Sequence, residues 1–304
     1  MKIYLNREPV SGPWGGGNKT VTQLATALMS VGHQVVYNLR DSDIDVLFCF
    51  DPRYNKYGEW YQDILNYKEE NAAKIVQRVG DLGTHGKPEL TNLVEQTINF
   101  SDFVIFPSEW AKEYSGFKGE NYKVIHNAPL AVFHDYKKDA SKIDGIELIT
   151  HHWSTNPKKG FEFYRYIDEH VVGEGINFTY IGRLPSNFKF KNSTFIEATG
   201  DNTYLAKKLA SSDLYITASE EEAGANHVLE ALAAGLPIVY HSNGGSIDDY
   251  CRDFGVCFNS QEELQKGIEL VLSQYSKYKQ KTLQYDNVIE KAIDQYLEAV
   301  CDIG

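Results

Sequence analysis

Two glutamates eight residues apart, Glu222 and Glu230, carry the strongest chemical signal in this sequence. Between them the chain changes from a polar, glycine-containing loop to a stretch rich in alanine and leucine that we expect to be helical. Gly235 can adopt the left-handed conformation that follows a helix end, and Pro237 prevents the helix from continuing. The start of such a helix leaves backbone N–H groups that stabilise an anionic ligand. The spacing therefore predicts one carboxylate in the loop facing a ligand and the other one to two turns into the helix.

The elements that must position these carboxylates alternate between strands and helices along the whole chain. Strands alternating with helices favour a parallel sheet covered on both faces. The 304 residues also suggest about two domains, so we expect an α/β protein with two doubly wound halves. The expected strands are Ile3–Leu5, Gln34–Tyr37, Val46–Phe50, Lys74–Val79, Phe103–Phe106 and Lys123–His126, then Ile146–Thr150, Phe178–Ile181, Thr194–Glu197, Leu214–Ala218, Ile238–Tyr240 and Val256–Phe258. The expected helices include Thr20–Val31 and a last one at Leu283–Val300.

The segment Ser219–Pro237 resembles the double-glutamate signature of retaining glycosyltransferases with the GT-B fold, particularly the large family 4. In that family a glutamate, seven residues and a Glu-Ala pair are followed by a small residue, glycine and proline before a strand. The pair Gly244-Gly245 matches the Gly-Gly that follows this strand. The resemblance covers most of the chain and is strongest from Asp213 to Tyr250. Shorter similarities are found in Gly32–Val36, Asp102–Trp110 and Val124–Ala128.

The resemblance implies two Rossmann-like domains with a cleft between them. We expect an acceptor-side domain at residues 1–143 and a nucleotide-sugar donor domain at 144–284. The polar stretch Ala131–Asp144 is the best linker candidate. Residues 285–304 would form the helix that crosses back to the first domain in GT-B proteins.

A glycine-rich loop, Gly12–Thr20, separates the first expected strand from the first helix. It is not a GxxxxGK[ST] phosphate loop, because Asn18 stands where the lysine belongs. It also lacks the third glycine of a dinucleotide fingerprint, since Thr20 takes that place. The resemblance implies that the backbone amides of Gly15, Gly16 and Gly17 approach the donor diphosphate. The alternative is a tight turn that requires positive φ.

The leaving group of a nucleotide-sugar donor is a nucleoside diphosphate. Negative charge develops on its phosphate oxygens in the transition state, so fixed cations are needed when no metal is used. The resemblance implies Lys159, in Asn156–Gly160, as one of them. The arginine that usually precedes this lysine is missing, and Trp153 stands six residues before it. Arg183, at the end of the next strand, could take over this role or be an ordinary surface residue. The adjacent His151 and His152 point to opposite faces of a strand, so no metal site is expected.

The resemblance also implies roles for the two glutamates. Glu222 would bind hydroxyls of the transferred sugar and Glu230 the ribose hydroxyls, because a carboxylate accepts two hydrogen bonds from a vicinal diol. Alternatively, Glu222 belongs to a solvated acidic run and Glu230 is an exposed helix residue. The helix start would offer backbone N–H groups to the donor, and His227 would serve packing. These N–H groups belong to Gly224, Ala225 and Asn226.

The loop Arg78–Gly86 follows a strand of the first half, where the loops of a parallel sheet line a ligand site. Members of the family often carry a histidine and an aspartate here, near the reacting centre. Asp81 and His85 are the candidates, although their order differs from the usual one. The alternative is that both are turn residues among glycines.

Composition limits the partners. A net charge of −12 argues against nucleic acid or an anionic membrane as the main partner.

The four cysteines are scattered without a CxxC pair, which suggests reduced thiols in a cytoplasmic protein. The chain starts directly with an expected strand instead of a signal peptide. No apolar run approaches the roughly 20 residues of a transmembrane helix.

The sequence thus predicts a metal-independent, retaining glycosyltransferase without a cofactor, whose donor substrate is a UDP- or GDP-sugar. The acceptor stays open among carbohydrates, lipid-linked acceptors and proteins. One alternative is a sugar-nucleotide epimerase or hydrolase of the same fold. The other is a non-catalytic protein that binds a nucleotide-sugar, which the missing arginine would favour.

Overall fold

The computed structural model describes residues 1–10, 16–137 and 145–303 of the chain. Gly15 and the expected domain boundary at 143/144 lie outside these described residues. The chain divides into two compact units. The first consists of Met1–Asn127 and Ile289–Gly304, and the second of Ala128–Val288.

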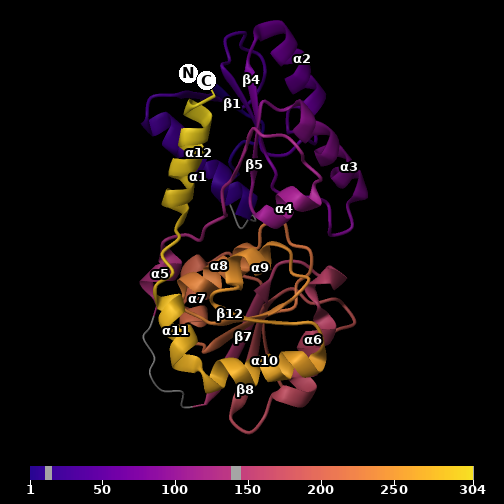
Figure 1. Ribbon diagram of the computed structural model, residues 1–304, viewed down its shortest axis with the longest axis vertical. Helices are drawn as coiled ribbons and strands as arrows, with labels where there is room; N and C mark the ends of the chain where they lie inside the picture. The colour runs from indigo at the N-terminus through magenta and orange to yellow at the C-terminus, as the bar shows by residue number, and fades with distance from the viewer. Residues whose placement is uncertain (11–15, 138–144, 304) are drawn as a thin grey trace. The chain divides into compact units, whose positions relative to one another are not determined.

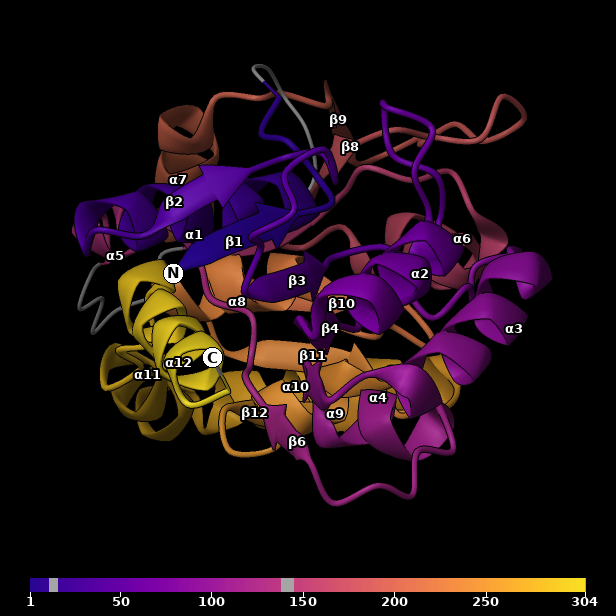
Figure 2. The same ribbon diagram turned by 90° about the horizontal axis from the view of Figure 1, so that it is seen from above.

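The first unit contains a parallel six-stranded sheet in the order β2-β1-β3-β4-β5-β6. Its last helix, α12, packs against α1 (Figures 1 and 2). The strands are β1 (Lys2–Leu5), β2 (Gln34–Val36), β3 (Val46–Cys49), β4 (Lys74–Arg78), β5 (Phe103–Phe106) and β6 (Tyr122–Val124). The α-helices are α1 (Gly16–Ser30), α2 (Tyr61–Asn71), α3 (Pro88–Thr97), α4 (Glu109–Tyr114) and α12 (Ile289–Cys301).

The second unit has its own parallel six-stranded sheet in the order β12-β11-β10-β7-β8-β9. Helices cover both of its faces. One buried apolar cluster includes residues of α7, α8 and α9, and a second includes residues of α6 and α10. The strands are β7 (Ile146–His152), β8 (Ile176–Gly182), β9 (Thr194–Glu197), β10 (Leu214–Thr217), β11 (Ile238–His241) and β12 (Gly255–Phe258). The α-helices are α5 (Val132–Asp135), α6 (Phe161–Tyr166), α7 (Asn202–Ala210), α8 (Asn226–Ala233), α9 (Ser246–Cys251), α10 (Gln261–Ser273) and α11 (Tyr275–Leu283).

The prediction of two doubly wound α/β halves is confirmed, since every expected strand overlaps a strand of the structure. The helix that separates Glu222 from Gly235 also ends as expected, with Gly235 at φ +84°. The last helix is shorter than expected, because it begins at Ile289 instead of Leu283. The Lys137 ammonium donates to the carbonyls of Leu283 and Tyr285, at 3.3 and 2.6 Å, and thereby caps the end of α11.

Gly160 allows the loop after β7 to touch the end of β10. It has φ +74°, and a Cβ built on it would lie 2.4 Å from both Cβ and the carbonyl oxygen of Ala218. A second contact follows beside it, since the Glu220 N–H donates to the Lys158 carbonyl at 2.9 Å. The conformation and the close approach both require glycine.

Gly160→Ala should therefore destabilise the second unit by about 3 kcal/mol or more, from the left-handed backbone and the overpacking together. Gly175→Ala is the matched control, because Gly175 also has positive φ but has no atom within 4 Å of its added Cβ. It should cost only about 1 kcal/mol. Urea unfolding of both variants measures the difference, and equal losses would contradict the role given to the Gly160–Ala218 contact.

Candidate functional site

Three predicted site residues follow neighbouring strands of the second sheet. Glu222 lies beyond the end of β10, Lys159 beyond β7 and Arg183 directly beyond β8. These strands are adjacent in the order β10-β7-β8 and run parallel. Their carboxyl ends consequently line one edge of the sheet, where ligands bind in open α/β folds.

Two lysine–glutamate pairs join the loops after β7 and β10. Lys159 donates from Nζ to Glu222 Oε1, and Lys158 donates from Nζ to Glu221 Oε2. The Lys159–Glu222 pair is the more enclosed, with side chains 10% and 16% exposed against 37% and 26% for the other pair. Charges in such an enclosed place interact strongly, and either one left unpaired would be costly.

The backbone of Glu222 is fixed by the loop after β11. Its N–H donates to the Gly244 carbonyl at 3.2 Å, and its own carbonyl accepts from the Ser246 N–H at 2.8 Å. Gly245, between these two partners, has φ +69°. The Gly-Gly pair therefore supports the loop that presents Glu222.

Glu230 lies one turn into α8, and it is buried instead of exposed on the helix surface. Its Oε2 lies 2.9 Å from Nε2 of His151, which is also buried. The hydroxyl of Tyr215 lies 3.1 Å from the other ring nitrogen of His151. These contacts fix the orientation of the Glu230 carboxylate. Sequence reasoning missed the contact of His151 with Glu230, because no local pattern links residues that lie 79 positions apart.

His227 stands among the charged groups of the site. Its ring packs against the rings of His151, His152 and Tyr215, and its Nε2 lies 3.1 Å from Thr217 Oγ1. Burial lowers the pKa of His227 to about 3, although the nearby carboxylates of Glu222 and Glu230 act in the opposite direction. The ring is therefore neutral at pH 7. Besides the expected packing, it gives Lys159, Glu222 and Glu230 one common uncharged neighbour.

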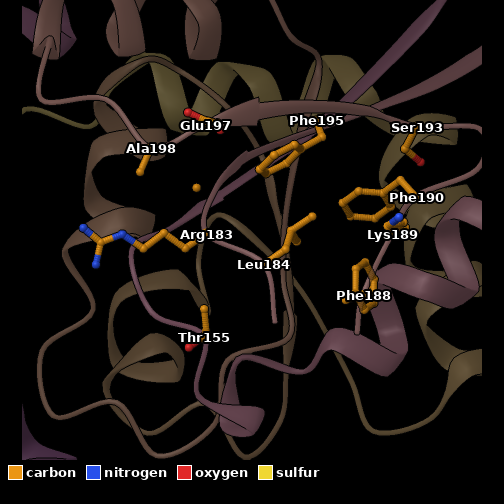
Figure 3. Close-up of a pocket in the computed structure, with 11 residues that line it drawn as sticks. Thr155, Arg183, Leu184, Phe188, Lys189, Phe190, Ser193, Phe195, Glu197 and Ala198 are labelled. Atoms are coloured by element: carbon orange, nitrogen blue, oxygen red, sulfur yellow. The ribbon is translucent and has the colours of Figure 1, made fainter. Parts of the chain in front are cut away.

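Arg183 and Trp153 lie at the same edge, directly after β8 and β7. Arg183 is exposed, and it lines a pocket together with Thr155 from the Lys159 loop (Figure 3). Trp153, which stands in place of the expected arginine, is 38% exposed and meets the His151 ring edge-on at 6.1 Å. Arg183 thus follows the strand next to β7, after which the Lys159 loop begins.

The N-terminus of α8 is already partly used. The Ala225 N–H donates to Ser246 Oγ at 3.0 Å. The N–H groups of Gly224 and Asn226 flank this bond at the start of the helix. Ser246 is therefore a further residue that sequence reasoning did not connect with the site.

The remaining candidates belong to the first unit. Asp81 accepts from the Lys87 ammonium at 2.6 Å and from the Gly83 N–H at 2.8 Å, so it stabilises its own loop. His85 lies on the same loop after β4. Gly16 and Gly17 form the first residues of α1, whereas Gly15 lies outside the described residues.

In the described part of the chain, no group of three or more histidine, cysteine, aspartate or glutamate side chains is arranged to hold a metal ion. None of its helices combines the length and the apolar character that a membrane span requires.

Comparisons with known proteins give a family match over part of the chain and a fold for the whole of it. The family profile of glycosyl transferases group 1 matches residues 147–287. The structure is similar to Alr3699/HepE of Anabaena solved with UDP, with a TM-score of 0.72, 14% identity and coverage of 99% of this chain and 100% of that one. It also resembles a glycosyltransferase from Rickettsia africae, with a TM-score of 0.72, 13% identity and coverage of 99% of this chain and 98% of that one. Sucrose-phosphate synthase from Thermosynechococcus elongatus is similar too, with a TM-score of 0.71, 12% identity and coverage of 100% of this chain and 99% of that one. No curated protein sequence matches the chain. The fold is GT-B.

The low pKa of His227 makes the stability of the second unit depend on pH. In the unfolded chain the ring titrates near pH 6.5, so protons bind the unfolded state first as the pH falls towards 3. The neutral ring therefore costs no stability above pH 6.5, and its penalty grows below that value by about 1.4 kcal/mol per pH unit.

Urea unfolding of wild type and His227→Gln between pH 6 and 4 isolates this contribution. As the pH falls, the free energy of unfolding of the wild type should decrease more steeply than that of the variant, by about 1.4 kcal/mol per pH unit. Parallel curves would show that His227 titrates normally in the folded protein.

Proposed function

We propose, from the premise that residues 147–287 form a domain of the glycosyl transferases group 1 family, that the chain transfers a sugar from a nucleoside-diphosphate sugar. The observation that carries the proposal is the set of Lys159, Glu222 and Glu230 around His227 at the carboxyl edge of the second sheet. Structures of the similar Anabaena protein with UDP and with UDP-glucose support this class of donor.

The two carboxylates suit the two diols of such a donor. Glu222 would accept hydrogen bonds from hydroxyls of the transferred sugar, and Glu230 from the ribose hydroxyls. The contact with His151 gives Glu230 one orientation before the ligand arrives. The N–H groups of Gly224, Ala225 and Asn226 would approach the donor from the start of α8, with Ala225 exchanging Ser246 for the ligand.

The reaction we propose retains the configuration of the sugar and uses no metal. The bond between the anomeric carbon and the diphosphate oxygen breaks, and a bond from the acceptor oxygen to that carbon forms on the same face. The acceptor proton passes to the leaving phosphate oxygen. Lys159 and Arg183 would stabilise the charge that develops on the diphosphate, which is the largest electrostatic demand of this step. His85 remains the candidate on the acceptor side.

Lys159 would have to exchange partners during this reaction. Without donor it neutralises Glu222. A diphosphate offers it more negative charge, and Glu222 then becomes available for the sugar hydroxyls. Donor binding thereby couples the release of Glu222 to the neutralisation of the leaving group.

Glu230→Gln should weaken the binding of nucleoside diphosphates by about tenfold or more, because a charged acceptor of the ribose hydroxyls becomes a neutral one. Glu269→Gln changes an exposed carboxylate on α10 and is the matched control. Isothermal titration with UDP and GDP measures both variants. Unchanged affinity in Glu230→Gln would show that Glu230 does not bind the ribose.

Lys159→Met should slow the release of nucleoside diphosphate from a nucleotide-sugar by about 100-fold or more, as expected for a lost transition-state charge partner. Lys158→Met is the control, since Lys158 pairs with Glu221 in the same turn and is more exposed. Thermal melting of each variant tests for an intact fold.

Measuring the release of nucleoside diphosphate with and without acceptors separates the transferase from the alternative functions. Donor binding without turnover across carbohydrate, lipid-linked and protein acceptors would indicate a binding protein instead of an enzyme. Turnover that needs no acceptor would indicate a hydrolase, and conversion of the bound sugar would indicate an epimerase.

A further inference from the structure

A pocket of about 760 Å³ lies at the carboxyl ends of β8 and β9 (Figure 3). Its volume falls in the range of small-molecule sites, roughly 300–1,000 Å³. It borders the proposed donor site, because Thr155 on the Lys159 loop contributes to its wall. Its lining combines apolar side chains (Leu184, Phe188, Phe190 and Phe195) with three charged ones, Arg183, Lys189 and Glu197.

The ring surface of the pocket is held in place. Phe188 and Phe190 meet edge to face, with centroids 4.9 Å apart, and the Arg165 guanidinium covers Phe188. The Asp168 carboxylate anchors the following loop by accepting three backbone N–H bonds at 2.7–2.9 Å. Phe195 is nevertheless 42% exposed. A fixed wall with an exposed aromatic face is suited to a planar ligand that stacks on it.

Glu197 lies two residues after Phe195 and therefore on the same face of β9. It pairs in register with Gly182, which precedes Arg183. Figure 3 shows Arg183 and Glu197 at the end of the pocket away from Phe188 and Phe190. Within the described residues, neither the Glu197 carboxylate nor the Arg183 guanidinium has a hydrogen-bond or ion-pair partner. Each is thus available to a ligand.

The strand order fixes which part of a donor could reach this pocket. Strands β10, β7, β8 and β9 follow one another, and three interstrand spacings of about 4.8 Å span roughly 14 Å. If the sugar diphosphate lies at Glu222 and Lys159, as proposed above, the base extends towards β8 and β9. It then lies between the Phe195 ring and the Glu197 carboxylate.

We infer that the pocket selects guanine, so that the donor is a GDP-sugar; this inference rests on the proposed function. Guanine carries two adjacent hydrogen-bond donors, N1–H and the N2 amino group, and a carboxylate can accept hydrogen bonds from both at once. Uracil has a single N–H between two carbonyl oxygens, which the carboxylate repels. Adenine places the acceptor N1 beside its amino group. Glu197 thus favours one base and disfavours the others, while Arg183 faces the phosphates.

Titration calorimetry with GDP, UDP and ADP on wild type, Glu197→Gln and Glu174→Gln tests the inference. Glu174 is the control, because it is exposed and lies before β8, at the opposite edge of the sheet. Wild type should bind GDP at least about tenfold more tightly than UDP or ADP. Glu197→Gln should lose about tenfold in GDP affinity and gain affinity for UDP, because a carboxamide both donates and accepts. Glu174→Gln should match wild type.

The possible failures are distinguishable. UDP or ADP binding as tightly as GDP, or GDP binding unchanged in Glu197→Gln, overturns the guanine assignment and leaves the proposed function intact. Failure of all three nucleotides to bind wild type overturns both. A loss shared equally by Glu197→Gln and Glu174→Gln also overturns the assignment, since a distant carboxylate would then have the same effect.

Discussion

The contact between the loop after β7 and the end of β10 is the constraint on which the site depends. Gly160 adopts a left-handed conformation and leaves no room for a side chain against Ala218. The neighbouring hydrogen bond from Glu220 to Lys158 closes the same gap. Because these two backbones touch, Lys159 and Glu222 meet although they are 63 positions apart. A wider separation would leave two charges partly buried and unpaired, at a substantial cost.

The electrostatics of the site follow from the partly buried position of Lys159 and Glu222. The chain carries a net charge of −12, yet Lys159 and Arg183 follow the adjacent strands β7 and β8 at the edge of the second sheet, where we propose that a diphosphate binds. His227 stays neutral among these groups, so it adds no positive charge against Lys159. The ion pair with Glu222 holds Lys159 in place without ligand. A phosphate group competes for the same lysine, and this competition would link donor binding to the freeing of Glu222.

Much of this architecture could be predicted from local sequence. Short β-branched and aromatic runs located all the strands, and Gly235 with Pro237 located the end of α8, because these signals depend on neighbours along the chain. The contact of His151 with Glu230 and that of Ser246 with Ala225 could not be predicted, since each joins residues on different elements. The same limit explains the last helix, whose start was misplaced because Lys137, far away in sequence, caps the end of α11.

A crystal structure of the protein with GDP or UDP bound would test most directly whether Lys159 serves the diphosphate. The account predicts that Lys159 Nζ leaves Glu222 and contacts a phosphate oxygen, while Glu230 accepts from the ribose hydroxyls and keeps its contact with His151. A nucleotide bound elsewhere, with Lys159 still paired to Glu222, would contradict it.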